Sequence, residues 1–136
     1  MVITITGSNF YLIKRRLDEL VGEFVTEHGD LALQKIDAEE AEPSTVLEAV
    51  QSLPFLANRK MIVVRGLSIN KVAAEQIEQI ISSAGDTTDL IFYELVIDKR
   101  TVYYKVLKAQ TQLEEYAELD VQQLARWLSK EAEKQD

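Results

Sequence analysis

The feature that most constrains the fold of this chain is a repeated change in the spacing of its apolar residues. Short runs of β-branched and aliphatic residues alternate with longer stretches in which apolar residues recur every three to four positions. The short runs are typical of strands, and the longer stretches are typical of amphipathic helices. Strands that alternate with helices form a mostly parallel sheet with helices on both faces. The sequence therefore predicts a three-layer α/β fold.

Five strands are expected. They cover residues 2–6, 31–36, 61–64, 89–93 and 113–116. The runs at 61–64 and 89–93 contain the uninterrupted apolar stretches, which indicate strands covered on both faces of a parallel sheet. The runs at 31–36 and 113–116 carry more polar residues, so we expect them to be more exposed or weaker strands.

Five helices are expected between and after these strands. They cover residues 9–28, 45–53, 73–84 and 102–107, with a last helix that begins after Asp120. We expect Ser8 or Asn9 to cap the first helix and Asp98 to cap the fourth, because short polar side chains satisfy free backbone N–H groups. Thr45 and Glu48 have the spacing of a capping box at the start of the second helix.

The length of 136 residues suits one domain with a substantial core. No linker or repeat divides the chain, so a single domain over residues 1–136 is expected. The sequence contains no cysteine, which excludes a disulfide, a thiolate metal site and a cysteine nucleophile.

The charge and hydropathy of the chain restrict its partners and its location. Lys and Arg number 15 against 23 Asp and Glu, so the formal net charge is −8. Nucleic-acid affinity depends largely on clustered Lys and Arg, so we expect protein partners and only indirect contact with DNA. No stretch approaches the roughly 20 apolar residues of a membrane helix. No membrane contact and a cytoplasmic location are therefore expected.

The turn after the first expected strand is where an open parallel sheet would bind a nucleotide. It reads Gly7-Ser8-Asn9 and continues directly into an apolar helix. A P-loop needs a longer glycine loop that ends in Gly-Lys-Ser/Thr, and a dinucleotide fingerprint needs two further glycines in register. We interpret this turn as a tight strand-to-helix connection without a working P-loop, and we expect no cofactor.

Other polar groups also have structural explanations. The acidic run from Asp37 to Glu42 is expected to be a solvated connection rather than a metal site. His28 has no cysteine, serine or second histidine to act with, and its position at the end of a helix explains its presence. Asp98-Lys99-Arg100 follows the fourth strand and is able to face a ligand, although helix capping by Asp98 with surface basic residues is the favoured interpretation. No catalytic set of residues is recognisable, so we expect no enzyme activity and no metal.

The segment from Ser52 to Lys60 is unusual for a connection between a helix and a buried strand. Such connections are rich in Gly, Asn, Asp and Ser. Here Leu53, Phe55 and Leu56 surround Pro54. Large apolar side chains on a proline-restricted loop resemble the anchors of protein interfaces. The same side chains would alternatively fold into the core, and the pattern alone does not separate the two interpretations.

Four segments in order carry a resemblance to a known family. They are the opening Ile5-Thr6-Gly7-Ser8-Asn9-Phe10-Tyr11-Leu12-Ile13, the stretch Leu53-Pro54-Phe55-Leu56-Ala57-Asn58-Arg59-Lys60 with the apolar run after it, Ile97-Asp98-Lys99-Arg100 with its following helix, and Leu124-Ala125-Arg126-Trp127-Leu128. Together they resemble the N-terminal domain of the delta subunits of bacterial DNA polymerase III, the clamp-opening component of the clamp loader.

The resemblance implies a P-loop NTPase-like, AAA+-like fold without nucleotide hydrolysis of its own, within the DNA polymerase III holoenzyme. It implies that Leu53, Phe55 and Leu56 bind the sliding clamp, the beta subunit, and help to open it during DNA replication. It also implies contacts with other clamp-loader subunits through a small helical domain and a helical collar domain that this chain lacks. The alternatives are a small nucleotide-binding or NTPase domain with a divergent phosphate loop, or a structural interaction module.

Overall fold

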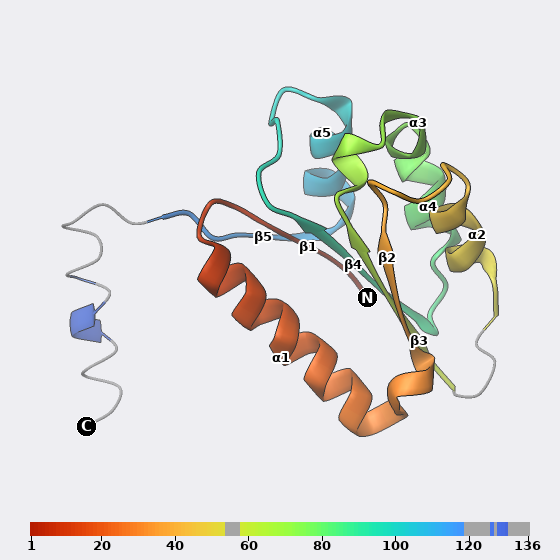
Figure 1. Cartoon of the computed structure of the whole chain (residues 1–136), viewed down its shortest axis with the longest axis horizontal. Helices are drawn as coiled ribbons and strands as arrows, with labels where there is room; N and C mark the ends of the chain where they lie inside the picture. Colours follow the sequence, from red (N-terminus) through yellow and green to blue (C-terminus); the bar gives the residue numbers. More distant parts are fainter. Residues whose placement is uncertain (54–57, 119–125, 127, 131–136) are drawn as a thin grey trace.

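Five parallel strands form one sheet with helices on both of its faces (Figure 1). The computed structural model describes residues 1–53, 58–118, 126 and 128–130. Within this part of the chain the strand order is β2-β3-β4-β1-β5, and all four strand pairs are parallel. The predicted three-layer α/β fold with a parallel five-stranded sheet is confirmed.

The strands follow the predicted apolar runs closely. They are β1 (Val2–Thr6), β2 (Leu33–Asp37), β3 (Lys60–Arg65), β4 (Thr88–Glu94) and β5 (Gln112–Glu115). β3, β4 and β1 form the middle of the sheet, which explains why their apolar residues are continuous. The second strand starts later than predicted, because Leu31 lies in the 3₁₀ turn η1 (Asp30–Ala32) by which the chain leaves the preceding helix.

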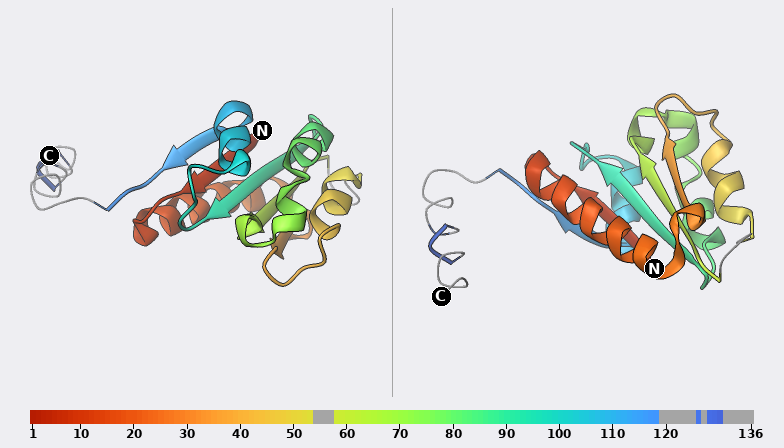
Figure 2. Two further views of the ribbon diagram at one scale, coloured as in Figure 1. Left: turned by 90° about the horizontal axis from the view of Figure 1, so that it is seen from above. Right: turned by 60° about the horizontal axis from the view of Figure 1, so that its bottom comes forward.

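The helices divide unequally between the two faces of the sheet. They are α1 (Phe10–His28), α2 (Thr45–Gln51), α3 (Lys71–Ala74), α4 (Ile77–Ser83) and α5 (Val102–Gln110), with a second 3₁₀ turn, η2 (Leu67–Ile69). Figure 1 and Figure 2 show α1 along one face and α2 to α5 gathered on the other. The expected helix after Asp120 lies outside the described residues, apart from Arg126 and residues 128–130.

Each face of the sheet has its own apolar core. Beneath α1 the buried side chains are Ile3, Ile5, Ile13, Leu20, Phe24, Met61, Val63 and Ile91. Beneath α2, α4 and α5 the core includes Val46, Val50, Ile62, Val64, Ile77, Ile80, Leu90, Phe92, Val106 and Leu107. Side chains alternate between the two faces along each strand, so a continuous apolar run supplies both cores at once.

The ends of α1 agree with the prediction. Asn9 caps the helix, with its side-chain Oδ1 accepting a hydrogen bond from the backbone N–H of Leu12 at 3.2 Å. Gly29 follows the last residue with φ 87°, and its N–H donates to the carbonyl of Val25 at 2.8 Å. Glycine adopts this positive φ without the steric penalty that a Cβ brings.

Three local predictions are wrong. The capping box does not form, because Thr45 is already the first helical residue of α2 and Ser44 occupies the N-cap position without a side-chain bond. Asp98 does not cap α5. Thr101 is closer to the helix and accepts from the N–H of Tyr104 at 3.2 Å, while Asp98 accepts from the N–H of Arg100 within the preceding turn.

The third wrong prediction concerns a single helix over residues 73–84. The chain forms α3 and α4 instead, separated at Gln76, whose φ of −90° and ψ of 10° depart from helical values. Asn70 caps α3 through its Oδ1, and its Nδ2 donates to the carbonyls of Ala38 and Ala41 at 3.0 and 3.2 Å. The side chain of Asn70 thereby links α3 to the connection that follows β2.

Across the described residues, no helix combines the length and apolar character needed to cross a membrane.

Candidate functional site

The predicted apolar segment begins where α2 ends. The N–H of Ser52 donates to the carbonyl of Glu48 at 3.1 Å, which completes the last turn. Leu53 follows with 86% of its surface exposed. Phe55 and Leu56, the other two predicted clamp-binding residues, lie outside the described residues. For Leu53, the structure therefore excludes the alternative that it belongs to the core.

The chain re-enters the sheet at Lys60, whose side chain returns to the end of α2. The ammonium Nζ donates to the carbonyl of Ala49 at 2.7 Å, to the Ser52 hydroxyl at 3.0 Å, to the Ser52 carbonyl, and more weakly to Val50 at 3.4 Å. Lys60 is only 8% exposed, and burial lowers the pKa of its ammonium group. The carbonyl oxygens at a helix C-terminus carry partial negative charge and favour the cation there.

Arg59, the residue before Lys60, is fastened to the neighbouring strand. Its guanidinium forms a two-bond pair with Asp89 at the start of β4, with distances of 2.6 Å and 3.3 Å. It also donates to the carbonyl of Asp86 at 2.8 Å. Such two-bond pairs fix geometry as well as contributing energy. Arg59 and Lys60 belong to a segment that resembles the delta family, but the sequence pattern predicts no role for either residue. The available signal was a pair of cations directly before a buried strand.

The position of this segment in the fold differs from the usual ligand-binding position. All strand pairs are parallel, so the start of β3 and the end of β1 lie at opposite ends of the sheet (Figure 1). Open parallel sheets generally bind small ligands outside the carboxyl ends of their strands. Lys60, the residue at which this segment joins the sheet, lies at the amino end of β3, opposite the turn that would bind a nucleotide.

The turn between β1 and α1 is occupied by the chain itself. Gly7 has φ 136°, and an added Cβ would collide with the backbone of Tyr116. The carbonyl of Tyr116 accepts from the N–H of Asn9 at 2.8 Å, and the hydroxyl of Ser8 accepts from the N–H of Glu118 at 3.0 Å. In a phosphate site, backbone N–H groups at this position point at the ligand. Here the N–H groups of Asn9 and Leu12 bond within the chain.

A small pocket lies beside this turn. It has a volume of about 180 Å³ and is lined by Thr6, Gly7, Ser8, Val96, Ile97, Lys99, Glu115 and Ala117. Lys99 lines this pocket, but its ammonium is paired with both carboxylate oxygens of Glu115 at 2.5 and 2.7 Å. The volume falls below the roughly 300 Å³ at which ligand pockets usually begin.

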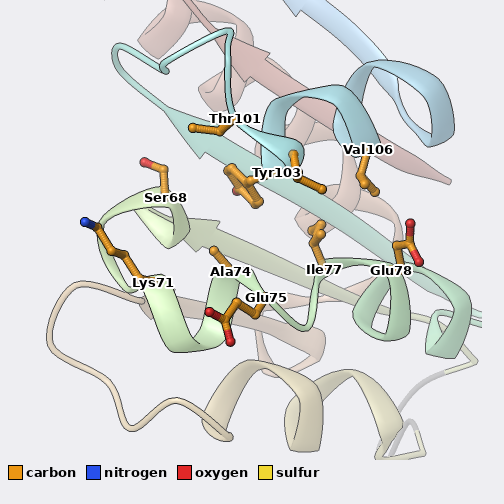
Figure 3. A pocket seen from close by; sticks show the side chains of 10 residues that line it. Ser68, Lys71, Ala74, Glu75, Ile77, Glu78, Thr101, Tyr103 and Val106 are labelled. Atoms are coloured by element: carbon orange, nitrogen blue, oxygen red, sulfur yellow. The ribbon is translucent and has the colours of Figure 1, made fainter.

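A larger pocket of about 580 Å³ lies between α3 and α4 on one side and α5 on the other (Figure 3). Its walls are mainly apolar, and its charged lining residues are Lys71, Glu75 and Glu78. One cation beside two carboxylates is a poor arrangement for binding phosphate groups.

Two other residues that line the larger pocket bind a buried carboxylate. Glu94, at the end of β4, is 2% exposed. It accepts from the N–H and the hydroxyl of Ser68 at 3.0 and 2.5 Å, and from the hydroxyl of Tyr103 at 3.0 Å. Burial, followed by the negative charge of Glu94, raises the pKa of Tyr103 well above its ordinary value, so its hydroxyl stays protonated and donates. This carboxylate connects β4, η2 and α5.

The acidic run after β2 is partly paired. One nitrogen of Arg65 lies 3.1 Å from a carboxylate oxygen of Asp37 and 3.1 Å from one of Glu39. Within the part of the chain that the structure describes, no group of three or more His, Asp or Glu side chains is placed to hold a metal ion.

The fold is one that clamp-loader proteins have. The chain matches the Bacillus subtilis DNA clamp loader delta protein with a TM-score of 0.67 and 19% identity, over 89% of this chain and 39% of that one. It matches a DNA polymerase III gamma subunit-related protein from Thermotoga maritima with a TM-score of 0.61 and 14% identity, over 90% of this chain and 42% of that one. The chain thus spans about two fifths of the length of either protein.

The amino-acid sequence matches a known protein family over most of its length. A model of the family described as DNA polymerase III, delta subunit, matches residues 4–117. The chain belongs to this family, as the four resembling segments predicted. A search of curated proteins found no match.

Proposed function

We propose that this domain binds the sliding clamp of the bacterial replication machinery and helps to open it. The observation that carries the proposal is the exposure of Leu53 at the end of α2, at the start of the segment that resembles the clamp-binding segment of the delta family. Phe55 and Leu56 are the main anchors in this proposal, and Leu53 assists them. Membership of the family supports a role in DNA replication.

The proposed contact has sufficient energy to shift an equilibrium in the clamp. Burying two large apolar side chains contributes about 3–6 kcal/mol before ordering costs. A binder shifts an equilibrium between closed and open clamp only by its difference in affinity for the two states. An apolar pocket on the clamp that is more accessible in the open form would supply this difference.

Residues 1–136 correspond in this proposal to the N-terminal, AAA+-like domain of a longer delta subunit. Other clamp-loader subunits would bind through helical and collar domains outside this chain, and those subunits would hydrolyse ATP. The net charge of −8 favours protein partners and only indirect contact with DNA. A cytoplasmic location is part of the same proposal.

A nucleotide-binding or NTPase domain is the main alternative. The sequence contains no Gly-Lys-Ser/Thr, and the N–H groups of Asn9 and Leu12 are bonded within the chain. These observations favour clamp binding without nucleotide chemistry. A structural module with Leu53 in its core is disfavoured by the exposure of that residue. Measurable ATP binding by the purified chain would instead support the nucleotide alternative.

Titration calorimetry against the sliding clamp of the same organism tests the proposal. We expect the wild-type chain to bind and the double variant Phe55→Ser, Leu56→Ser to lose binding by at least about a hundredfold, the equivalent of roughly 2.7 kcal/mol. Circular dichroism should show both proteins equally folded. A double variant that loses its fold would place these side chains in the core, and a folded wild type that does not bind would exclude the proposed function.

A further inference from the structure

Lys60 joins the two ends of the apolar segment. Its ammonium reaches the last turn of α2, where it donates to the carbonyl and the hydroxyl of Ser52, eight residues earlier in the chain. It also donates to the carbonyl of Ala49. Ser52 is the first residue of the segment and follows the last residue of α2, and Lys60 is the last residue of the segment and the first of β3. The side chain of Lys60 therefore holds the end of α2 close to the start of β3.

The burial of this ammonium needs an explanation, because a buried charge is costly unless it is paired and hydrogen-bonded. Among the described residues no carboxylate lies within ion-pair distance of Lys60; its partners are the carbonyl oxygens of α2 and the hydroxyl of Ser52. An apolar side chain at this position would make none of these hydrogen bonds. What the lysine adds is a fixed connection between α2 and β3.

Arg59 reinforces the same attachment from the other side. Its two-bond pair with Asp89 fastens the start of β3 to β4, and its bond to the carbonyl of Asp86 holds it to the preceding turn. The side chain of Asp89 is only 10% exposed, so this pair is partly shielded from solvent. The two consecutive cations thus bind different elements: Lys60 binds the end of α2, and Arg59 binds the start of β4.

We propose that Lys60, assisted by Arg59, is a positioning residue for the clamp-binding segment. This inference rests on the function proposed above. A loop whose ends are held at a fixed separation has fewer conformations to lose when it binds, so its affinity is higher for the same contacts. Lys60 acts on the clamp only through the segment, and makes no contact with it.

The variant Lys60→Met tests the inference, since methionine has a similar length and no donors. We expect clamp affinity to fall about tenfold, the size of the ordering cost of one or two flexible side chains. Lys60→Arg retains the charge and has donors, although in a larger, planar group, and we expect it to bind the clamp more tightly than Lys60→Met. Rescue by arginine would separate a positioning role from a general requirement for bulk in the core.

Arg16→Met is the matched control. Arg16, in α1, pairs with Glu114, in β5, with the shorter bond at 2.8 Å, so its loss also removes a partly buried cation. We expect it to lower the melting temperature and leave clamp affinity unchanged. Should Lys60→Met fail to fold, Arg59→Gln takes its place, with an expected loss of several-fold in affinity through the same attachment.

The outcomes separate this inference from the function on which it rests. A wild-type chain that does not bind the clamp overturns both. A wild type that binds, with a double variant at Phe55 and Leu56 that does not, retains the proposed function. If Lys60→Met, or Arg59→Gln in its place, then binds the clamp as tightly as Arg16→Met does, the positioning role of Lys60 is wrong.

Discussion

At the scale of single residues, similar side chains have opposite environments in this chain. Leu53 is 86% exposed, whereas Leu67 is fully buried although it also follows the end of a regular element. Exposed leucines occur singly in most soluble proteins and need no explanation by themselves. The exposure of Leu53 has functional weight because Phe55 and Leu56 follow it within three residues.

The buried carboxylate of Glu94 leads to a prediction at this scale. Tyr103→Phe removes one of its donors and leaves a charged oxygen without that bond. Ser68 still donates to Glu94, so we expect a loss of about 1.5–3 kcal/mol in the free energy of unfolding, the usual contribution of a hydrogen bond to a charged group. Urea denaturation measures it. Tyr11→Phe is the matched control, because Tyr11 is 71% exposed, and its effect should stay within about 0.5 kcal/mol. Equal stability of the two variants would contradict the role of Tyr103.

At the scale of elements, α1 is attached to the edge strand β5 by one ion-pair network. The Arg16 guanidinium donates to both oxygens of Glu114 at 2.8 and 3.3 Å, and the hydroxyl of Tyr116 donates to the same carboxylate at 2.7 Å. Burial alone would raise the pKa of Glu114, but the hydrogen bonds from Arg16 and Tyr116 outweigh it, and the pKa of Glu114 is lowered. Among the described strands β5 pairs with β1 alone, so this network is a further attachment of the edge strand.

The lowered pKa of Glu114 gives this attachment a pH dependence. In the unfolded chain the carboxyl has its ordinary, higher pKa, so the folded state binds fewer protons in acid. Its contribution is complete above the ordinary value and is lost as the pH falls through the lower folded value. We expect Glu114→Gln to cost about 1 kcal/mol at pH 7 and nearly nothing at pH 2, measured by chemical denaturation.

Glu78→Gln is the control for this measurement, because Glu78 lies at the exposed rim of the larger pocket. It should leave the free energy of unfolding unchanged within about 0.5 kcal/mol at neutral pH. A difference between wild type and Glu114→Gln that stays constant from pH 7 to pH 2 would show that the ionised pair does not stabilise the contact between α1 and β5.

At the scale of the whole molecule, the sequence predicted the sheet well and the contacts between elements poorly. The strands are predictable because continuous apolar runs such as residues 62–64 contribute side chains to both cores. The start of α5 at Val102 agrees with the prediction, but its cap does not, because Asp98 and Thr101 are both good caps and only the path of the turn selects Thr101. No sequence pattern predicts the hydrogen bond from Lys60 to Ser52, because this bond depends on where α2 ends relative to β3.

The candidate site was likewise predictable from the sequence only in part. The apolar character of the segment that starts at Leu53 was visible in the sequence, because leucine and phenylalanine are unusual around a proline in a connection. The structure added the exposure of Leu53 and the attachment of both ends. It also placed Lys60, where the segment joins β3, at the end of the sheet opposite the β1–α1 turn.

Site-specific photo-crosslinking tests the central claim most directly. A photoreactive phenylalanine analogue in place of Phe55 would report contact at the proposed anchor, and the same analogue in place of Tyr11 would report from the opposite end of the sheet. With the sliding clamp present, we expect a covalent product from position 55, which excess unmodified wild-type chain suppresses, and no product from position 11. A product from position 11 alone, or none from either position under conditions where the two proteins bind, would contradict the account.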